Sequence, residues 1–231
     1  MIGKQYAPLT ATEYSETFAT FVEKLREKDE YETIVEPIFK EFGSKPVRFL
    51  SIGAGTGWME DIFVTKYRLK MSFYYAIEPN PSHSEKLKDT ITSWNVENTI
   101  DSGFFTSNMD IAHTFDVIFM AHCLYCIEDP CQAVIHAKSF LNPGGLLIIL
   151  LQNGTGMREL VSHFKENATL VPDSFANHLF YDKDVFQFLT KSGINFQVKD
   201  DILGATLEID DFVRQQSSKN VNDAISFILQ K

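Results

Sequence analysis

Cysteine, basic charge and long apolar runs are all scarce in this chain of 231 residues. Its three cysteines all lie within residues 123–131, so the sequence contains no disulfide framework. Lysine and arginine number 21 against 31 acidic residues, a formal net charge of −10, whereas a nucleic-acid binder normally carries a basic face. The longest apolar run, residues 145–151, is far shorter than the roughly 20 residues that a membrane span needs. Residues 1–6 lack the apolar stretch of a secretory signal. We therefore expect a cytoplasmic globular protein that binds neither nucleic acid nor membrane.

The organisation along the chain is that of one domain. No repeat, low-complexity tract or linker rich in proline or serine interrupts it, and the sequence predicts a single domain over residues 1–231. Residues 1–44 are expected to form two helices, the first with Thr12 as its N-cap and with Tyr14 and Phe18 on its apolar face.

From residue 45 short apolar stretches alternate with amphipathic ones, and this alternation predicts a parallel sheet with helices on both faces. The expected strands are 47–52, 73–78, 101–105, 115–121, 145–151, 194–201 and 224–229. The expected helices between and after them are 58–66, 81–94, 129–141, 182–192 and 208–216. The sequence thus predicts an α/β fold with a doubly wound, mostly parallel sheet of seven strands.

A glycine-rich segment joins the first expected strand to the first helix of this core. Gly53, Gly55 and Gly57 allow positive φ angles and let a ligand approach the backbone at a helix N-terminus. Glu78 ends the next strand, where a carboxylate can accept both hydroxyls of a ribose. The two features together predict a cofactor that contains adenosine. A dinucleotide fingerprint requires a glycine three positions after its second one, but Trp58 stands there, so a nicotinamide cofactor fits poorly.

The pattern G-x-G-x-G resembles the first motif of class I S-adenosylmethionine-dependent methyltransferases, which have a Rossmann-like fold. The strand Phe115-Asp-Val-Ile-Phe and the segment Leu141-Asn-Pro-Gly-Gly-Leu-Leu-Ile-Ile occur in the same order as in that family. The resemblance implies S-adenosylmethionine as cofactor. It also implies that residues 1–44 form a helical lid, that 45–152 bind the cofactor, and that 153–231 supply helices and strands on the substrate side.

Within that family the chain is most similar to the histamine N-methyltransferases. The similarity includes Tyr14-Ser-Glu-Thr-Phe-Ala-Thr-Phe, the loop Leu50-Ser-Ile-Gly-Ala-Gly-Thr-Gly with a serine where most methyltransferases carry an acid, and the pair Glu78-Pro79. It implies substrate contacts at Glu27, His122, Tyr125, Asp223 and Phe18, with catalytic roles for His122, Glu27 and Asp223. The implied cofactor contacts are Tyr14, Gly53, Gly55, Gly57, Glu78, Pro79, His83, Ser107 and Ala121.

The chemistry of three of these residues suits a small amine. Glu27 and Asp223 would attract an ammonium group through charge-assisted hydrogen bonds, and His122, at a strand's carboxyl end, could accept a proton near neutral pH. Other interpretations stay open. Glu27 lies in a charge run typical of a solvated face, Asp223 suits a turn, and His122 suits an ordinary strand-end histidine.

Several aromatic residues that line the substrate pocket of that family are missing from this chain. Cys126 stands where the family has a second tyrosine, and its tryptophan positions fall near Met157 and Val161. Because an aromatic cage favours cations and flat rings, the thinner cage of this chain points to a different or larger amine. Histamine is a lead for the methyl acceptor. The alternatives are a methyltransferase for another small metabolite and a protein that binds S-adenosylmethionine without turnover. In each case we expect a monomer whose partner is a small molecule.

One cluster of possible metal ligands lies after the fourth strand. His122, Cys123, Cys126, Cys131 and His136 fall within fifteen residues and include a C-x₂-C pair. Strand alternation directs the first two to opposite sides, and no second C-x₂-C pair exists. We therefore expect small buried thiols beside a loop and no metal.

Overall fold

The computed structural model describes residues 10–24, 35–40, 42–151 and 180–198. The chain divides into two compact units, one made of residues 1–41 and 198–231, the other of residues 42–197. Each unit is described by itself below.

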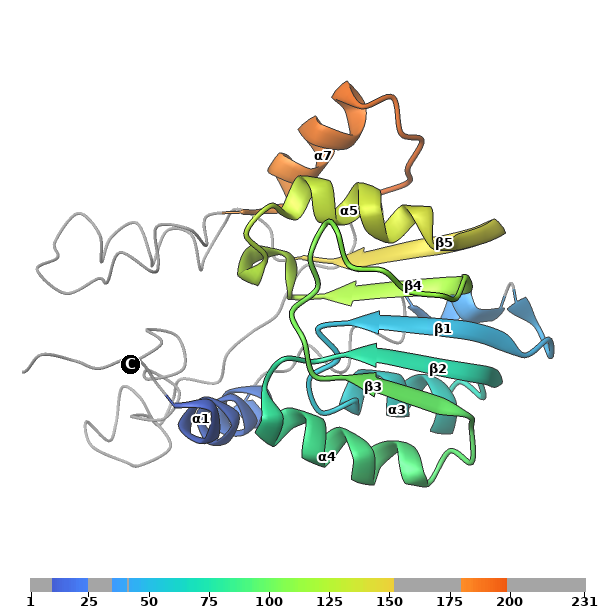
Figure 1. The fold of residues 1–231 in the computed structure, drawn as a ribbon. Helices are drawn as coiled ribbons and strands as arrows, with labels where there is room; N and C mark the ends of the chain where they lie inside the picture. The colour runs from blue at the N-terminus through green and yellow to red at the C-terminus, as the bar shows by residue number, and fades with distance from the viewer. Residues whose placement is uncertain (1–9, 25–34, 41, 152–179, 199–231) are drawn as a thin grey trace, which may run out of the picture. The chain divides into compact units, whose positions relative to one another are not determined.

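The larger unit is built on a parallel sheet whose five strands follow the order β3-β2-β1-β4-β5 (Figure 1). The strands are β1 (Val47–Ile52), β2 (Met71–Ile77), β3 (Asn98–Asp101), β4 (Phe115–Ala121) and β5 (Leu141–Leu150). All four neighbouring pairs are parallel. The chain adds β2 and β3 on one side of β1 and then crosses to add β4 and β5 on the other, so the predicted doubly wound α/β fold is confirmed.

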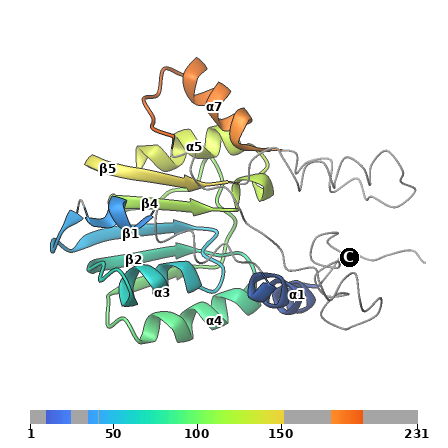
Figure 2. The ribbon, with the colours of Figure 1, turned by 180° about the vertical axis from the view of Figure 1, so that it is seen from behind.

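Helices cover both faces of this sheet. They are α3 (Trp58–Thr65), α4 (Pro81–Thr92), the short 3-10 helix η1 (Leu124–Cys126), α5 (Pro130–Ser139) and α7 (Asp182–Lys191). In two opposite views α5 and α7 lie beside β5, and α3 and α4 lie on the side of β2 (Figures 1 and 2). The bounds of α3, α4, α5 and α7 agree with the predicted helices to within two residues at each end, whereas η1 was not predicted.

The alternation of side chains along the strands gives each face its own apolar layer. On one face Phe63 of α3 packs against Phe49 and Phe119, with ring centroids 6.5 and 5.2 Å apart. On the other face the core includes Leu50 and Met120, which are buried together with residues of α5 and α7. A strand buried on both sides is mostly apolar, and in β1 and β4 the polar residues are Arg48, Ser51 and Asp116.

The third strand differs from the prediction, which placed it at 101–105. It runs from Asn98 to Asp101 and pairs with β2, so Asp101 is its last residue. The apolar pair Phe104-Phe105 suggested a strand, but Asp101 accepts a hydrogen bond from the amide of Gly103 at 2.7 Å and starts a turn. Phe105 is buried in the core, whereas Phe104 is exposed.

The last predicted strands also need correction. β5 starts at Leu141, four residues before the predicted 145, with a register shift against β4 and with Gly144 at φ 79° inside the irregular stretch. Residues 194–198, predicted to begin a sixth strand, form no strand. The seventh, 224–229, and the helix 208–216 lie outside the described residues. Five strands, in place of the predicted seven, are therefore present in the described part of the chain.

The described part of the smaller unit is helical. α1 runs from Ala11 to Lys24, and residues 35–40 are also helical. The helix α1 is capped by Thr10 in place of the predicted Thr12, because the amide of Glu13 donates to the Thr10 hydroxyl (3.3 Å) and the Glu13 carboxylate accepts from the Thr10 amide (2.9 Å). The lid function of these helices stays a prediction.

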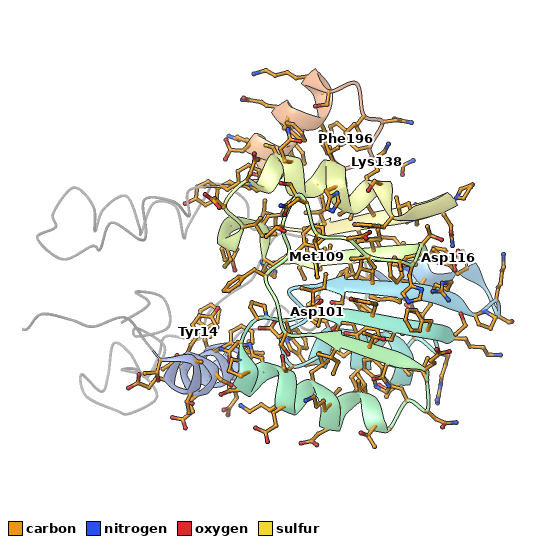
Figure 3. The ribbon with its side chains drawn as sticks, in the orientation of Figure 1. Tyr14, Asp101, Met109, Asp116, Lys138 and Phe196 are labelled. Atoms are coloured by element: carbon orange, nitrogen blue, oxygen red, sulfur yellow. The ribbon has the colours of Figure 1, made fainter. Side chains whose placement is uncertain are left out.

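The two ends of the sheet have different polar groups. Asp116, at the amino end of β4, accepts hydrogen bonds from the Arg48 amide and the Asn142 side chain, whereas Asp101 lies at the opposite, carboxyl end (Figure 3). The contacts of Asp116 join β1, β4 and β5, so this acid stabilises the sheet.

No helix in the described ranges is long and apolar enough to cross a membrane.

Candidate functional site

The candidate site lies where the strand order reverses, at the carboxyl ends of β1 and β4. In open α/β sheets ligands bind in the crevice outside such a switch point. The two loops touch there, because a Cβ built on Gly53 would lie 2.5 Å from the Cβ of Cys123. The Cys123 thiol donates to the carbonyl of Ile52 at 3.1 Å. Glycine at 53 is thus required by the close approach of the loop after β4.

The loop 53–57 connects β1 to α3, as predicted. Gly53, Gly55 and Gly57 have φ angles of 69°, 57° and 74°, in the left-handed region. Gly57 is also the N-cap of α3, and a Cβ on it would lie 2.5 Å from Cδ1 of Leu87. A Cβ on Gly55 would meet no atom within 4 Å. Gly55 therefore differs from the other two, since its neighbourhood leaves open space above the backbone.

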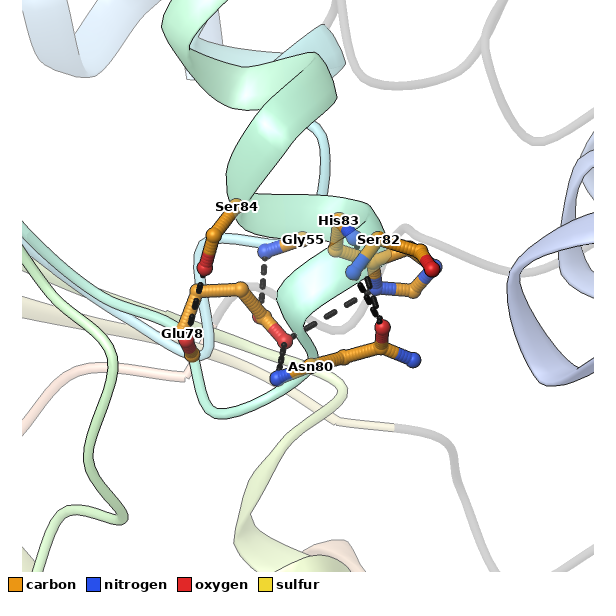
Figure 4. A network of polar contacts seen from close by, with 6 residues as sticks. All are labelled: Gly55, Glu78, Asn80, Ser82, His83 and Ser84. Carbon is orange, nitrogen blue, oxygen red and sulfur yellow. Dashed lines mark hydrogen bonds and ion pairs between the residues drawn. The ribbon is translucent and has the colours of Figure 1, made fainter. Parts of the chain in front are cut away.

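Glu78 directly follows β2, and its side chain reaches back to the glycine loop. The carboxylate accepts the Gly55 amide through Oε2 at 2.7 Å and the Asn80 amide through Oε1 at 2.8 Å (Figure 4). The residue is 5% exposed. Two backbone amides thus hold this carboxylate at the carboxyl end of β2, and each oxygen keeps a further lone pair for a ligand hydroxyl.

The start of α4 surrounds the same carboxylate. Asn80 is the N-cap and accepts the amides of Ser82 (2.9 Å) and His83 (3.3 Å), with Pro81 in the first turn. Nδ1 of His83 lies 3.8 Å from Oε1 of Glu78. The structure therefore brings together Gly55, Glu78 and His83 of the predicted cofactor set.

The end of β3 adds an acid that the sequence analysis did not select. The amide of Glu78 donates to the carbonyl of Asp101 at 2.9 Å, so Asp101 lies beside Glu78 at the carboxyl edge. It was missed because the strand was placed three residues too late. The predicted contact Ser107 lies in an exposed turn farther along this connection.

The end of β4 carries three more predicted residues. Ala121 is its last residue, His122 follows, and Tyr125 lies in η1; all three are half-buried. The backbone of His122 has φ 51°, which is uncommon for a residue other than glycine, and its amide donates to the carbonyl of Leu150 at 2.9 Å. Such strained conformations gather at functional sites, and the β4–β5 pairing fixes this one.

Two of the five possible metal ligands of this region, Cys123 and His136, have hydrogen-bond partners in the protein. Burial raises the pKa of the Cys123 thiol well above its usual value, so this group is a neutral donor. Nε2 of His136 lies 2.6 Å from the carbonyl oxygen of Met109. Among the described residues, no three His, Cys, Asp or Glu side chains are arranged to hold a metal ion.

Four of the remaining predicted residues lie in the other unit or outside the described residues. Tyr14 and Phe18 lie on α1, in the other unit, with their rings stacked at 6.2 Å. Glu27 and Asp223 lie outside the described residues. Pro79 lies between Glu78 and the cap of α4.

A buried acid below the glycine loop was also missed. Glu60, in the first turn of α3, accepts hydrogen bonds from the hydroxyl of Ser51 on β1 and, at 3.4 Å, from the hydroxyl of Tyr74 on β2. Burial raises the pKa of Glu60 to about 7, although the Ser51 hydrogen bond opposes this shift. The sequence signal available was an acid on the apolar face formed by Met59 and Phe63, three residues after the last glycine.

The arrangement fits a cofactor that contains adenosine. The open space at Gly55 admits a ligand close to the loop backbone, and the N-terminus of α3 favours electron-rich groups there. The carboxylate of Glu78 presents paired acceptors for vicinal hydroxyls of a ribose. The structure therefore supports the ligand class predicted for the loop and the strand end.

Comparison with known proteins gives one family match. The profile of a family described as a methyltransferase domain matches residues 14–195. No curated protein matches the chain.

Solved structures with a similar fold are methyltransferases of low identity. The N-methyltransferase NodS from Bradyrhizobium japonicum, in complex with S-adenosyl-L-homocysteine, is 17% identical, with 78% of this chain and 85% of that chain covered and a TM-score of 0.56. The plantazolicin methyltransferase BpumL, in complex with a monoazolic analog and S-adenosyl-homocysteine, is 16% identical, with 93% and 82% covered and a TM-score of 0.57. A possible histamine N-methyltransferase from Thermotoga maritima is 20% identical, with 79% and 82% covered and a TM-score of 0.47.

Proposed function

Because the chain belongs to the methyltransferase-domain family, we propose that it is an N-methyltransferase that acts on a small amine, with histamine or a related imidazole amine as the preferred acceptor. The predicted cofactor, S-adenosylmethionine, is confirmed by this family and by neighbours crystallised with its demethylated product. The observation that carries the cofactor part of this proposal is the Glu78 carboxylate, held by the amides of Gly55 and Asn80 beside open space at the glycine loop.

The residues of the larger unit that would hold the cofactor are those around this carboxylate. Glu78 would accept the ribose hydroxyls, and the loop backbone at Gly55 would lie against the rest of the molecule. When bound, S-adenosylmethionine supplies a methyl group that leaves its sulfur as the acceptor nitrogen bonds to the carbon. The contribution of the protein is to align the acceptor and exclude water.

On the acceptor side, His122 and Tyr125 extend from the end of β4, next to the glycine loop. We assign His122 to hold the acceptor and to take the proton that its nitrogen loses, because a neutral imidazole ring has a nitrogen that can accept a proton. Glu27 and Asp223 are assigned to the cationic end of the amine. The net charge of −10 and the fold shared with NodS, which is an N-methyltransferase, favour an amine over an acidic acceptor.

Two measurements on one sample test the proposal. Calorimetric titration with S-adenosyl-homocysteine measures cofactor binding, and incubation with S-adenosylmethionine and a panel of amines, read by mass spectrometry, measures methyl transfer. Micromolar binding of the homocysteine product and methylation of an imidazole amine are the expected results. Absence of cofactor binding would overturn the site, whereas turnover of oxygen acceptors alone would overturn N-methylation.

Matched variants connect the result to the residues. Glu78→Ala is expected to abolish cofactor binding, whereas Glu85→Ala, which removes an exposed carboxylate of α4, leaves it unchanged. His122→Ala is expected to lower kcat more than it raises the KM of the cofactor. His113→Ala, which removes an exposed histidine before β4, serves as its control.

A further inference from the structure

Glu60 is a buried acid with no direct part in the assigned contacts. It is 2% exposed, and its carboxyl group receives hydrogen bonds from Ser51 on β1 and Tyr74 on β2. Both donors are also buried, at 1% and 0% exposure. One carboxyl group therefore joins two neighbouring strands to the first turn of α3, inside the apolar layer formed by Phe49, Phe63 and Phe119.

The carboxyl group of Glu60 and the hydroxyl of Ser51 lie on the two sides of the glycine loop. Ser51 precedes Gly53 by two residues, and Glu60 follows Gly57 by three. Their hydrogen bond consequently joins the two ends of the loop 53–57. The tip of the loop is held separately, by the bond from the Gly55 amide to Glu78.

We propose that Glu60 is a positioning residue for the cofactor: by holding Ser51 and Tyr74, it fixes the two ends of the glycine loop in the geometry that binds S-adenosylmethionine. This inference rests on the proposed function. Glu60 acts through the loop and does not touch the ligand. With an apolar side chain at 60 the hydroxyls of Ser51 and Tyr74 would lose their buried acceptor, and the start of α3 would lose its link to the end of β1.

The chemistry of the carboxyl group defines the test. Both hydroxyls donate to one oxygen of Glu60, and a glutamine side chain keeps that acceptor at the same place. Glu60→Gln should therefore preserve the position of the loop, whereas Glu60→Ala removes both bonds. Asp61→Ala is the matched control, because Asp61 is the neighbouring acid of α3 and accepts from the indole of Trp94 at 2.8 Å, away from the loop.

The experiment is calorimetric titration of the full chain with S-adenosyl-homocysteine near pH 7, together with thermal unfolding of each variant. Glu60→Ala should weaken binding by about tenfold or more, and Glu60→Gln should restore it to within about threefold of the wild type. Asp61→Ala should lower the Tm but leave the Kd unchanged. Ser51→Ala, which deletes a single oxygen, should also weaken binding. It tests the same hydrogen bond if Glu60→Ala does not fold.

The outcomes separate this inference from the proposed function. If the wild type does not bind S-adenosyl-homocysteine, the proposed function fails. If the wild type binds S-adenosyl-homocysteine and both Glu60→Ala and Ser51→Ala bind it with the Kd of the wild type, the positioning role is refuted while the proposed function stands. A loss in Asp61→Ala equal to that in Glu60→Ala would also refute it, since the effect would then follow helix stability alone.

Discussion

Replacing Gly55 with alanine should separate ligand binding from stability. Gly55 has φ 57°, and a Cβ there meets no atom within 4 Å, so the substitution strains the backbone without a clash. The left-handed conformation costs a residue other than glycine about 1–2 kcal/mol. In a chain of this size each kcal/mol lowers the Tm by roughly 2–4 °C. The new methyl group occupies the space through which a ligand approaches the loop, so the Kd for S-adenosyl-homocysteine should rise about tenfold or more.

The control for this variant is Gly43→Ala. Gly43 has φ 59° and equally open surroundings, but it lies before β1, at the opposite end of the strand from the glycine loop. Both variants should show the same fall in Tm by differential scanning fluorimetry, and calorimetry should show weaker binding in Gly55→Ala alone. Equal Kd values in the two variants would refute the assignment of open space at Gly55 to the ligand.

Three further predictions concern stability. Burial raises the pKa of Glu60 from 4.5 to about 7, so between these pH values the folded state binds a proton that the unfolded state has lost. The contribution of this group to the free energy of unfolding should be greatest below about pH 4.5 and fall by roughly 3 kcal/mol as the pH rises through 7. Urea unfolding at several pH values should show this slope in the wild type and not in Glu60→Gln. Asn80→Ala and Asp129→Ala each remove a helix N-cap and should each cost about 1 kcal/mol in chemical denaturation, but only Asn80→Ala, beside Glu78, should weaken binding of S-adenosyl-homocysteine. Phe63→Ala removes a ring that is 1% exposed between α3 and the sheet and should cost about 3–5 kcal/mol; a loss below about 1 kcal/mol in the same assay would contradict the packing described.

Strands with strong apolar runs were predictable from the sequence, and polar ones were not. Residues 47–52 and 115–121 have the predicted bounds because both strands are central and buried on two faces. β3 lies at the edge of the sheet and consists of Asn, Thr, Ile and Asp, so its alternation is weak. The aromatic pair that follows it was mistaken for the strand itself, although one ring fills the core from a loop.

Within the site, backbone geometry was easier to predict than buried polar contacts. Glycine spacing predicted the loop, and Glu78 was predicted at a strand end as an acceptor for ribose hydroxyls. Its hydrogen bond with the Gly55 amide was not predicted. An acid in the first turn of a helix is ordinary at the surface, so the place of Glu60 on the apolar face with Met59 and Phe63 was the sole sequence signal of its burial. Its burial depends on the hydroxyls of Ser51 and Tyr74, which only the folded sheet brings together.

The contact between Gly53 and Cys123 makes two otherwise separable parts of the molecule interdependent. The loops after β1 and β2 carry the groups assigned to the methyl donor, whereas those after β4 carry groups assigned to the acceptor. Substitutions in the acceptor half can change specificity without moving Glu78, except where Cys123 packs on Gly53. A larger side chain at position 123 would clash with the glycine loop at Gly53. A substitution at either position therefore requires a compensating substitution at the other.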